Sequence, residues 1–421
     1  MNFQQIISVL IFVVVMGAII SEKVNRTVAA LAGAILMIAF KILTLDTGLE
    51  HVDFNTIGVL IGMMLFVAVI KNSGLFEYIA IWTAKKTKGD PWKIMVYFMI
   101  VSAVLSAVLD NVTTVLLIGP MTIVVTQLLG VNPIPFLMTQ ILASNIGGTA
   151  TLIGDPPNIM IGSAAGLSFL DFVVHLGPVV VVIFAVTVIA FKFIYGKQLV
   201  VSEEAKESII KLDEKKSIQD KSLLKKSIIF IFFTLFGFMF HSNLGVESSV
   251  VALTSAVIML FIGRQDIDDI FASIEWSTIF FFVGLFIVVG GMVESGVIGQ
   301  LAEIIIGLTE GHIVATTMII LWLSAIISAF LDNIPFVATL IPLILTMQAE
   351  GIDVTPLWWA TSLGACLGGN GSLIGASANV VLAGVSAKHG HPITFGYFLK
   401  IGFPLMILSI AISTVYLLLV F

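Results

Sequence analysis

Two aspartates, Asp110 and Asp332, interrupt long apolar stretches, and an asparagine follows each of them. An ionisable side chain at membrane depth is costly, so it is first interpreted as a functional group. A third aspartate, Asp155, lies in a run containing glycine and proline. Because Asp110 and Asp332 form a duplicated pair, they are the favoured functional carboxylates. Asp155 fits a helix cap and a functional carboxylate equally well.

Each member of the pair opens a short polar segment, LDNVTT at 109–114 and LDNIPF at 331–336. Backbone within lipid must satisfy its own hydrogen bonds, so such a break is tolerated only against protein or water. We expect Asn111, Thr113 and Thr114 to supply the missing partners and to cap the helix that follows. Pro335 suits the first turn of a restarting helix. The segments 92–129 and 314–347 are therefore predicted to be re-entrant hairpins.

Two further segments, 134–166 and 355–387, are predicted to be helices broken at glycine-rich runs. Glycine lets backbone approach a ligand closely. Unwound carbonyls can hold a cation, and half-helix N-termini attract anions. We therefore take the candidate solute- and ion-binding residues from both tips and both breaks: Asp110, Asn111, Thr113, Thr114, Asn145, Gly147, Gly148, Thr149, Thr151, Asp155, Asn158, Asp332, Asn333, Gly368, Gly369, Asn370, Ser372, Ser377 and Asn379.

The chain contains an internal repeat. A shift of 222 positions places Asp110 on Asp332 and brings the first tip onto the second. After one gap the shift becomes 221, and Asn158 falls on Asn379. This predicts a first repeat over 1–196, a linker over 197–226 and a second repeat over 227–421. Inverted repeats with interrupted helices at matching places indicate a secondary transporter with a midplane site.

Composition determines the fold class. The chain has 421 residues, of which 58% are hydrophobic and 11% charged. Its continuous apolar runs predict an all-α polytopic membrane protein with about ten transmembrane helices besides the hairpins and broken helices. Continuous rather than alternating runs exclude a β-barrel. The single cysteine, Cys366, excludes an internal disulfide and fits a small buried residue.

Loop charge predicts the topology. Lysines gather in the linker and mark the cytoplasmic side, so both termini are expected outside a bacterial-type inner membrane. The linker itself is interpreted as a solvated, partly helical connector without a regulatory role. The sequence has no basic patch with aromatic residues of the kind that binds nucleic acid, so no nucleic-acid partner is expected. The lipid bilayer is the expected surroundings of the chain.

The carboxylates limit the solute. Ionised Asp110 and Asp332 would repel an anion, and no basic residue lies inside either break. This favours H⁺ or Na⁺ as coupling ion and a neutral or cationic solute, with no resident cofactor or metal. An enzyme is not expected: the residues before Asp155 lack the Gly-x-Gly of aspartyl intramembrane proteases, and neither a His-Glu-x-x-His zinc motif nor a phosphate loop occurs.

The motifs LDNVTT (109–114), NIGGTATLIGDPPN (145–158), DNIPF (332–336) and GACLGGNGSLIGASANVV (364–381) resemble the ion transporter superfamily. The resemblance is greatest to its arsenite/antimonite permease and melanosomal P-protein branch, with a citrate-transporter-like domain. It covers nearly the whole chain except the linker. It implies a homodimer with a scaffold part and a moving transport part that holds both hairpins. For an arsenite permease it also implies an ATPase partner.

These observations predict H⁺-coupled, elevator-type efflux of arsenite, antimonite or a similar small solute, with Asp110 and Asp332 as proton carriers. Three alternatives stay open: Na⁺/H⁺ antiport by the same aspartates, symport of an anion or carboxylate, and a channel.

Overall fold

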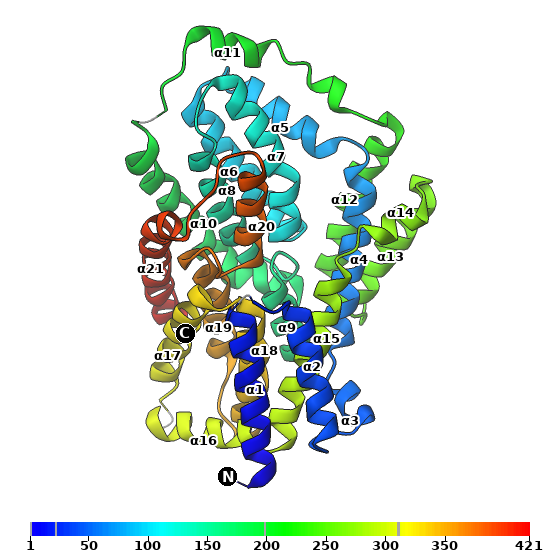
Figure 1. Ribbon diagram of the computed structural model, residues 1–421, viewed down its shortest axis with the longest axis vertical. Coiled ribbons are helices and arrows are strands. Elements are labelled where there is room, and N and C mark those ends of the chain that lie inside the picture. Colours follow the sequence, from blue (N-terminus) through cyan, green and yellow to red (C-terminus); the bar gives the residue numbers. More distant parts are fainter. Residues whose placement is uncertain (1, 22, 198, 310–311) are drawn as a thin grey trace.

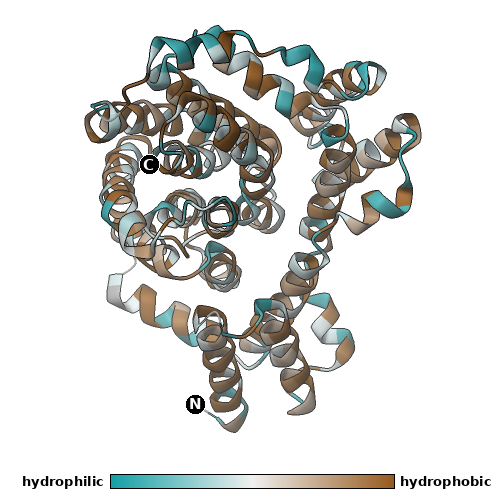
Figure 2. Ribbon diagram, turned by 45° about the horizontal axis from the view of Figure 1, so that its top comes forward, coloured by the Kyte–Doolittle hydropathy of each residue, from teal (hydrophilic) through white to brown (hydrophobic). Residues whose placement is uncertain are grey.

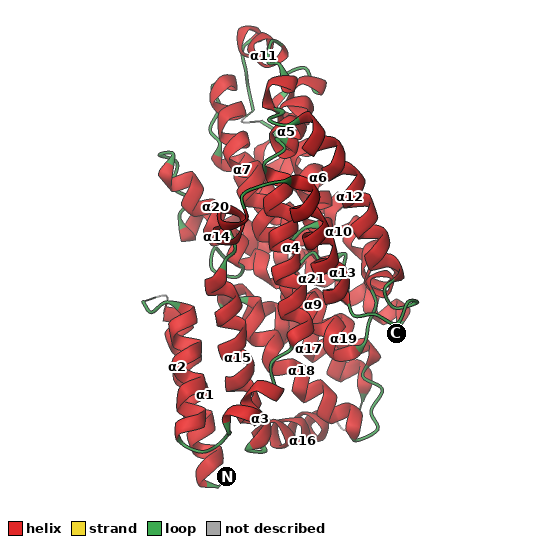
Figure 3. Cartoon of the chain, turned by 90° about the vertical axis from the view of Figure 1, so that its right-hand side faces the viewer, coloured by secondary structure: helices red, strands yellow, loops and turns green. Residues whose placement is uncertain are grey.

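The computed structural model describes the whole chain except residues 1, 22, 198 and 310–311, and the described part is helical, without a strand (Figure 3). The first half contains α1 (Phe3–Ser21), α2 (Arg26–Ala39), α3 (Leu45–Glu50), α4 (Phe54–Lys71), α5 (Leu75–Lys86), α6 (Pro91–Val108), α7 (Asn111–Leu129), α8 (Ile134–Thr149), α9 (Pro156–Ala165) and α10 (Phe169–Tyr195).

The linker contains α11 (Glu203–Ile210) and a 3₁₀ turn, η1 (Glu214–Ser217). The second half contains α12 (Lys221–Phe240), α13 (Ser248–Gly263), α14 (Ile267–Ala272), α15 (Trp276–Glu294), α16 (Val297–Thr309), α17 (Ile313–Phe330), α18 (Asn333–Ala349), α19 (Thr355–Gly368), η2 (Gly369–Gly371), α20 (Ser377–Lys388) and α21 (Phe395–Val420).

The helices form two bodies. The scaffold consists of α1–α4 and α12–α15, in which α4 packs on α13 and α2 packs on α15. The bundle consists of α6–α10 and α17–α21, in which α6 packs on α8 and α17 on α19. Two short helices lead from scaffold to bundle at opposite ends of the molecule: α5 near the top of Figure 1 and α16 near the bottom. We call α5 and α16 the arms.

Corresponding helices begin at positions related by the shift found in the sequence. α6 and α17 begin at Pro91 and Ile313, and α7 and α18 begin at Asn111 and Asn333. The broken helices also correspond, since α8–α9 and α19–α20 are each interrupted by an irregular glycine-rich segment. Inversion of the two copies across a membrane stays a prediction.

Nine described helices are long and apolar enough to cross a bilayer. Among them are α6 and α7, of 18 and 19 residues, each about 27–29 Å long at 1.5 Å per residue. Both helices of the first hairpin, α6 and α7, are thus as long as full crossings, and the re-entrant character of this hairpin stays a prediction. Hydrophobic residues make up most of the helices, whereas hydrophilic residues gather along the linker (Figure 2).

Glycines set the close crossings of helices. A Cβ on Gly62 of α4 would lie 2.6 Å from the backbone of Ala252 in α13, and a Cβ on Gly284 of α15 would lie 2.7 Å from that of Ala30 in α2. In the bundle, a Cβ on Gly147 of α8 would lie 2.2 Å from the carbonyl oxygen of Ala103 in α6. These positions admit no side chain unless the helices separate.

We therefore expect Gly147→Ala to disrupt the α6–α8 contact and to lower the yield and thermal stability of the purified protein, by about 1–3 kcal/mol as in overpacked cores. Gly384→Ala in α20 is the matched control, because no atom lies within 4 Å of its added Cβ. Equal melting temperatures of the two variants would contradict the role of Gly147.

The linker is not the freely solvated connector that its composition predicts. Ile209 of α11 is fully buried, and α11 packs on α7 while η1 packs on α5. Apolar residues within the lysine-rich run, such as Ile209, explain the difference, because their burial holds the linker against the bundle.

Candidate functional site

The first hairpin tip is capped by its own aspartate. Asp110 is the N-cap of α7, and its Oδ1 accepts a hydrogen bond of 2.7 Å from the backbone N–H of Thr113. The prediction that Asn111, Thr113 and Thr114 side chains cap this helix is therefore wrong. Asn111 instead donates to Asn145 in the broken helix at 3.2 Å, and the buried Thr114 hydroxyl has no hydrogen-bond partner among the described residues.

The second tip is paired with a cation. Arg26, the first residue of α2 in the scaffold, donates from Nη1 to Asp332 Oδ2 at 2.8 Å and to Ser377 Oγ at 2.7 Å. The Ser377 hydroxyl in turn donates to Asp332 Oδ2 at 2.8 Å. On the scaffold side the guanidinium lies 5.0 Å from the ring centre of Phe281 and 3.4 Å from the Thr278 hydroxyl.

Arg26 is the functional residue that sequence reasoning missed. It lies between the first two apolar runs, outside both breaks, and no basic residue lies inside the breaks themselves. A usable signal was present: at the repeat shift, Arg26 corresponds to Ser248. The two aspartates are therefore not equivalent, because Asp332 has a counter-ion from the scaffold and Asp110 has none in the described hydrogen bonds and ion pairs.

Asp155 occupies the N-cap position of α9, but its side chain makes no cap hydrogen bond. Its side chain is directed to the second tip, where Asn333 Nδ2 lies 3.3 Å from both carboxylate oxygens. The residue is 1% exposed. The capping interpretation is thus wrong for its side chain, and Asp155 joins the first broken helix to the second hairpin.

A cavity of about 160 Å³ lies where these elements meet the scaffold. Its ionisable lining residues are Arg26, Lys71, Asp110, Asp155 and Glu275. Asp332 lines a neighbouring cavity of about 280 Å³, and Arg26 and Ser377 line both. The duplicated aspartates therefore do not share one cavity, and Arg26 lies between them.

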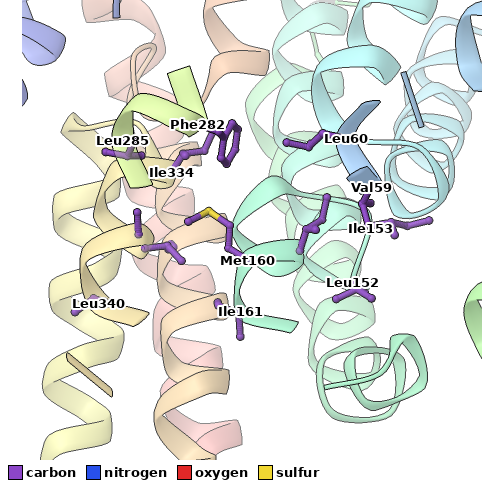
Figure 4. Packing of buried hydrophobic residues seen from close by; sticks show 14 of the residues in the cluster. Val59, Leu60, Leu152, Ile153, Met160, Ile161, Phe282, Leu285, Ile334 and Leu340 are labelled. Atoms are coloured by element: carbon purple, nitrogen blue, oxygen red, sulfur yellow. The ribbon is translucent and has the colours of Figure 1, made fainter. Parts of the chain in front are cut away.

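The remaining lining is largely apolar. It includes Val59 and Leu60 of α4, Ile153 in the first break and Ile334 of the second tip. Figure 4 shows Leu60, Val59 and Ile153 on one side of this region and Ile334, beside Phe282 of α15, on the other. Because apolar contacts between scaffold and bundle are not directional, the directional contact near this cavity is the ion pair between Arg26 and Asp332. The uncharged polar lining residues are Asn111, Thr113, Ser273, Thr278, Asn333 and Ser377.

Two asparagines brace the breaks. Asn158 Nδ2 reaches the carbonyl oxygens of Gly148, Thr149 and Thr151 at 3.4, 3.2 and 2.9 Å. Its counterpart Asn379 donates to the carbonyls of Gly369 and Ser372 at 2.7 and 2.9 Å. These carbonyls already accept amide hydrogen bonds, and cation binding by the breaks stays a prediction.

A third asparagine joins the two breaks. Asn145 Nδ2 lies 2.9 Å from the Oδ1 atoms of both Asn370 and Asn379. The other predicted polar residues also serve the backbone: Thr149, Thr151 and Ser372 donate to the carbonyls of Asn145, Ala107 and Ala329. Gly148 and Gly368 approach backbone carbonyls, of Gly154 and Ala325, rather than the cavity.

We expect Asn158→Leu to destabilise the protein by on the order of 2–3 kcal/mol, since it leaves buried carbonyls without donors. The measurement is the thermal unfolding of purified protein. Asn72→Leu is the matched control, because Asn72 bonds only Gln265 at the surface. A melting temperature unchanged by Asn158→Leu would contradict the bracing role.

A helical membrane fold with a charged cavity between two bodies is the arrangement of a membrane transporter. The chain belongs to the citrate transporter family, CitMHS, whose sequence profile matches residues 16–364. This family is part of the ion transporter superfamily, so the resemblance of the motifs is confirmed.

Known proteins agree with this placement. An uncharacterized transporter of Mycobacterium tuberculosis is 42% identical to this chain, and the match covers 98% of this chain and 97% of that protein. The human P protein is 31% identical over 96% of this chain and 58% of its own length. The crystal structure of the Alcanivorax borkumensis YdaH transporter shares the fold, with a TM-score of 0.62, 14% identity, and coverage of 99% of this chain and 97% of its own.

Proposed function

We propose that this chain is a proton-coupled secondary transporter of the cell membrane that exports arsenite, antimonite or a similar small uncharged solute. The bundle moves as an elevator against the scaffold of a homodimer. The observation that carries the proposal is Asp155, a buried carboxylate on the cavity whose described hydrogen-bond partner is the neutral amide of Asn333. A buried carboxylate that faces a cavity at membrane depth, with no cation among its described ion pairs, is a candidate proton carrier.

The geometry supports Asp110 and Asp155, rather than Asp110 and Asp332, as the proton-carrying pair. Asp332 is already held by Arg26 in an ion pair of 2.8 Å. Asp110 and Asp155 line the same cavity and have no such partner among the described ion pairs. Arg26–Asp332 then acts as the contact that bundle movement must break.

The charges also support an uncharged solute. Asp110, Asp155 and Glu275 face the cavity, while Arg26 is already balanced by Asp332 and Lys71 remains as the other base. Citrate, the solute in the family's description, would bring several negative charges to this surface. Arsenous acid is uncharged at neutral pH and would require no such compensation.

Na⁺/H⁺ antiport is the second candidate, and one observation favours it. Asn111 Oδ1 and the Thr114 hydroxyl, beside Asp110, are buried without hydrogen-bond partners in the described part of the chain. Oxygen atoms of carboxylates, amides and hydroxyls are the ligands that hard cations prefer. Na⁺ at this tip would compete with a proton on Asp110.

Proteoliposomes that contain a pH-sensitive dye test both candidates. Na⁺, arsenite, antimonite and citrate are added in turn, with protein-free liposomes as the control. Proton movement in response to arsenite or antimonite alone supports metalloid/proton exchange. A response to Na⁺ alone identifies an antiporter, and a response to citrate alone overturns both candidates in favour of carboxylate transport.

A further inference from the structure

The described linker segment 199–220, which we call the linker strap, lies along the first arm. It leaves the bundle after α10, crosses the top of the molecule above α5 and α7, and joins the scaffold at α12 (Figure 1). A connector that only had to span this gap would need no contacts along the way. The linker strap instead touches the bundle, the arm and the end of the scaffold helix α4.

At the bundle, the contact is apolar. Ile209 of α11 is fully buried in the same hydrophobic cluster as Val125 and Leu129 of α7. Close backbone packing accompanies it: a Cβ on Gly89, in the turn between α5 and α6, would lie 2.7 Å from Cα of Lys206. Gly89 has φ +72°, which glycine adopts without strain. The linker strap thus fits tightly over the base of the first hairpin.

On the arm itself, the contact is ionic. Lys85 Nζ, in the last turn of α5, lies 2.6 Å from Glu214 Oε2 of η1. The hydrogen bond from Lys85 lowers the pKa of the Glu214 carboxyl, so Glu214 is ionised at neutral pH. The side chains of Lys85 and Glu214 are only 31% and 18% exposed, so salt screens this pair less than a surface pair, and it fixes the position of η1 on the arm.

At the hinge between α4 and α5, the contact is backbone to backbone. Gln219 N–H donates to the carbonyl of Ser73 at 3.2 Å. A Cβ on Gly74, which has φ +80°, would lie 1.9 Å from the Ser217 carbonyl oxygen. The hinge of the second arm is different: a Cβ on Gly296 would lie 3.6 Å from a Gln5 side-chain atom, with no backbone of another segment among its nearest neighbours.

We propose that the linker strap is a restraint that stabilises the conformation of this structure by holding the first arm against both the hinge and the hairpin base. Its contacts lie on both sides of the α4–α5 hinge, so any rotation of α5 relative to α4 breaks at least one of them. A contact made in one conformation and lost in another shifts the equilibrium between the two. Weakening the linker strap therefore populates the alternative arrangement of scaffold and bundle.

Distances between spin labels test this directly and independently of the transported solute. Val104→Cys on α6 and Val257→Cys on α13, both exposed, report the bundle and the scaffold in a Cys366→Ser background. The linker-strap variants are Ile209→Asn and Lys85→Gln. The matched control is Lys211→Gln, because Lys211 and its partner Glu207 are 76% and 67% exposed on the same helix.

We expect the linker-strap variants, and not the control, to raise the share of a second distance by at least about fivefold, the lower end of typical coupling between sites. Size-exclusion chromatography identifies any variant that fails to fold. If Ile209→Asn fails to fold, the distance distribution of Lys85→Gln alone tests the proposal. Folded variants with the wild-type distance distribution would overturn the proposal, as would an equal change in Lys211→Gln.

Discussion

Arg26→Gln is expected to reduce coupled transport by about 30- to 150-fold, equivalent to about 2–3 kcal/mol. Removing the guanidinium leaves Asp332 at the scaffold–bundle interface without its counter-ion. The expected loss of free energy is smaller than the full cost of breaking a buried ion pair, because the Arg26 side chain is 31% exposed and the Asp332 side chain 13%. The measurement is the initial rate of solute-driven proton movement in proteoliposomes.

The chain's other arginine provides the control. Arg264 is exposed at the end of α13, so Arg264→Gln should transport at the wild-type rate. Arg26→Gln combined with Asp332→Asn removes both charges and should recover part of the rate lost in the single variant. If the double variant is no better than Arg26→Gln, Arg26 acts through some contact other than Asp332.

The sequence predicted the breaks well because they are local features. Asp110, Asn145, Asp155 and Asp332 stand out against apolar runs, and glycine-rich segments mark where helices stop. The structure places all four at the meeting point of tips and breaks. Polar residues in an apolar chain carry their own signal, since each needs a partner or a function.

The partners of these residues could not be predicted, because they come from elements far apart in the chain. Arg26 and Asp332 are separated by 306 positions, and Asp155 and Asn333 by 178. The repeat suggested that matching residues have matching roles, yet Arg26 corresponds to Ser248 and Asp155 to Ala376. The contacts that distinguish the two tips therefore come from positions where the two copies differ.

This asymmetry gives the two halves of the site different tasks. On the side of the second tip, Arg26 and Ser377 bind Asp332 and join the bundle to the scaffold. On the side of the first break, Asp155 lines the cavity without a cation in the described ion pairs and is the proton carrier that we propose. A proton-driven cycle needs both a group that titrates and a contact that responds to movement.

Asp155→Asn is expected to reduce proton-driven transport to the rate of protein-free liposomes while leaving the protein folded. The amide keeps the size of the carboxylate and can still accept a hydrogen bond from Asn333, so the contact between break and tip survives. Proton uptake by this group is lost, because an amide does not titrate. The measurements are dye-reported proton flux and the melting temperature of the same preparation.

Asp171→Asn is the matched control, because that carboxylate closes a capping box with Ser168 at the start of α10. It should lower stability slightly and leave proton flux intact. Flux that persists in Asp155→Asn and disappears in Asp110→Asn would assign the proton to the first tip alone. Flux that persists in both would exclude these carboxylates as the carriers and leave Glu275, the remaining acid on the cavity, as the next residue to replace.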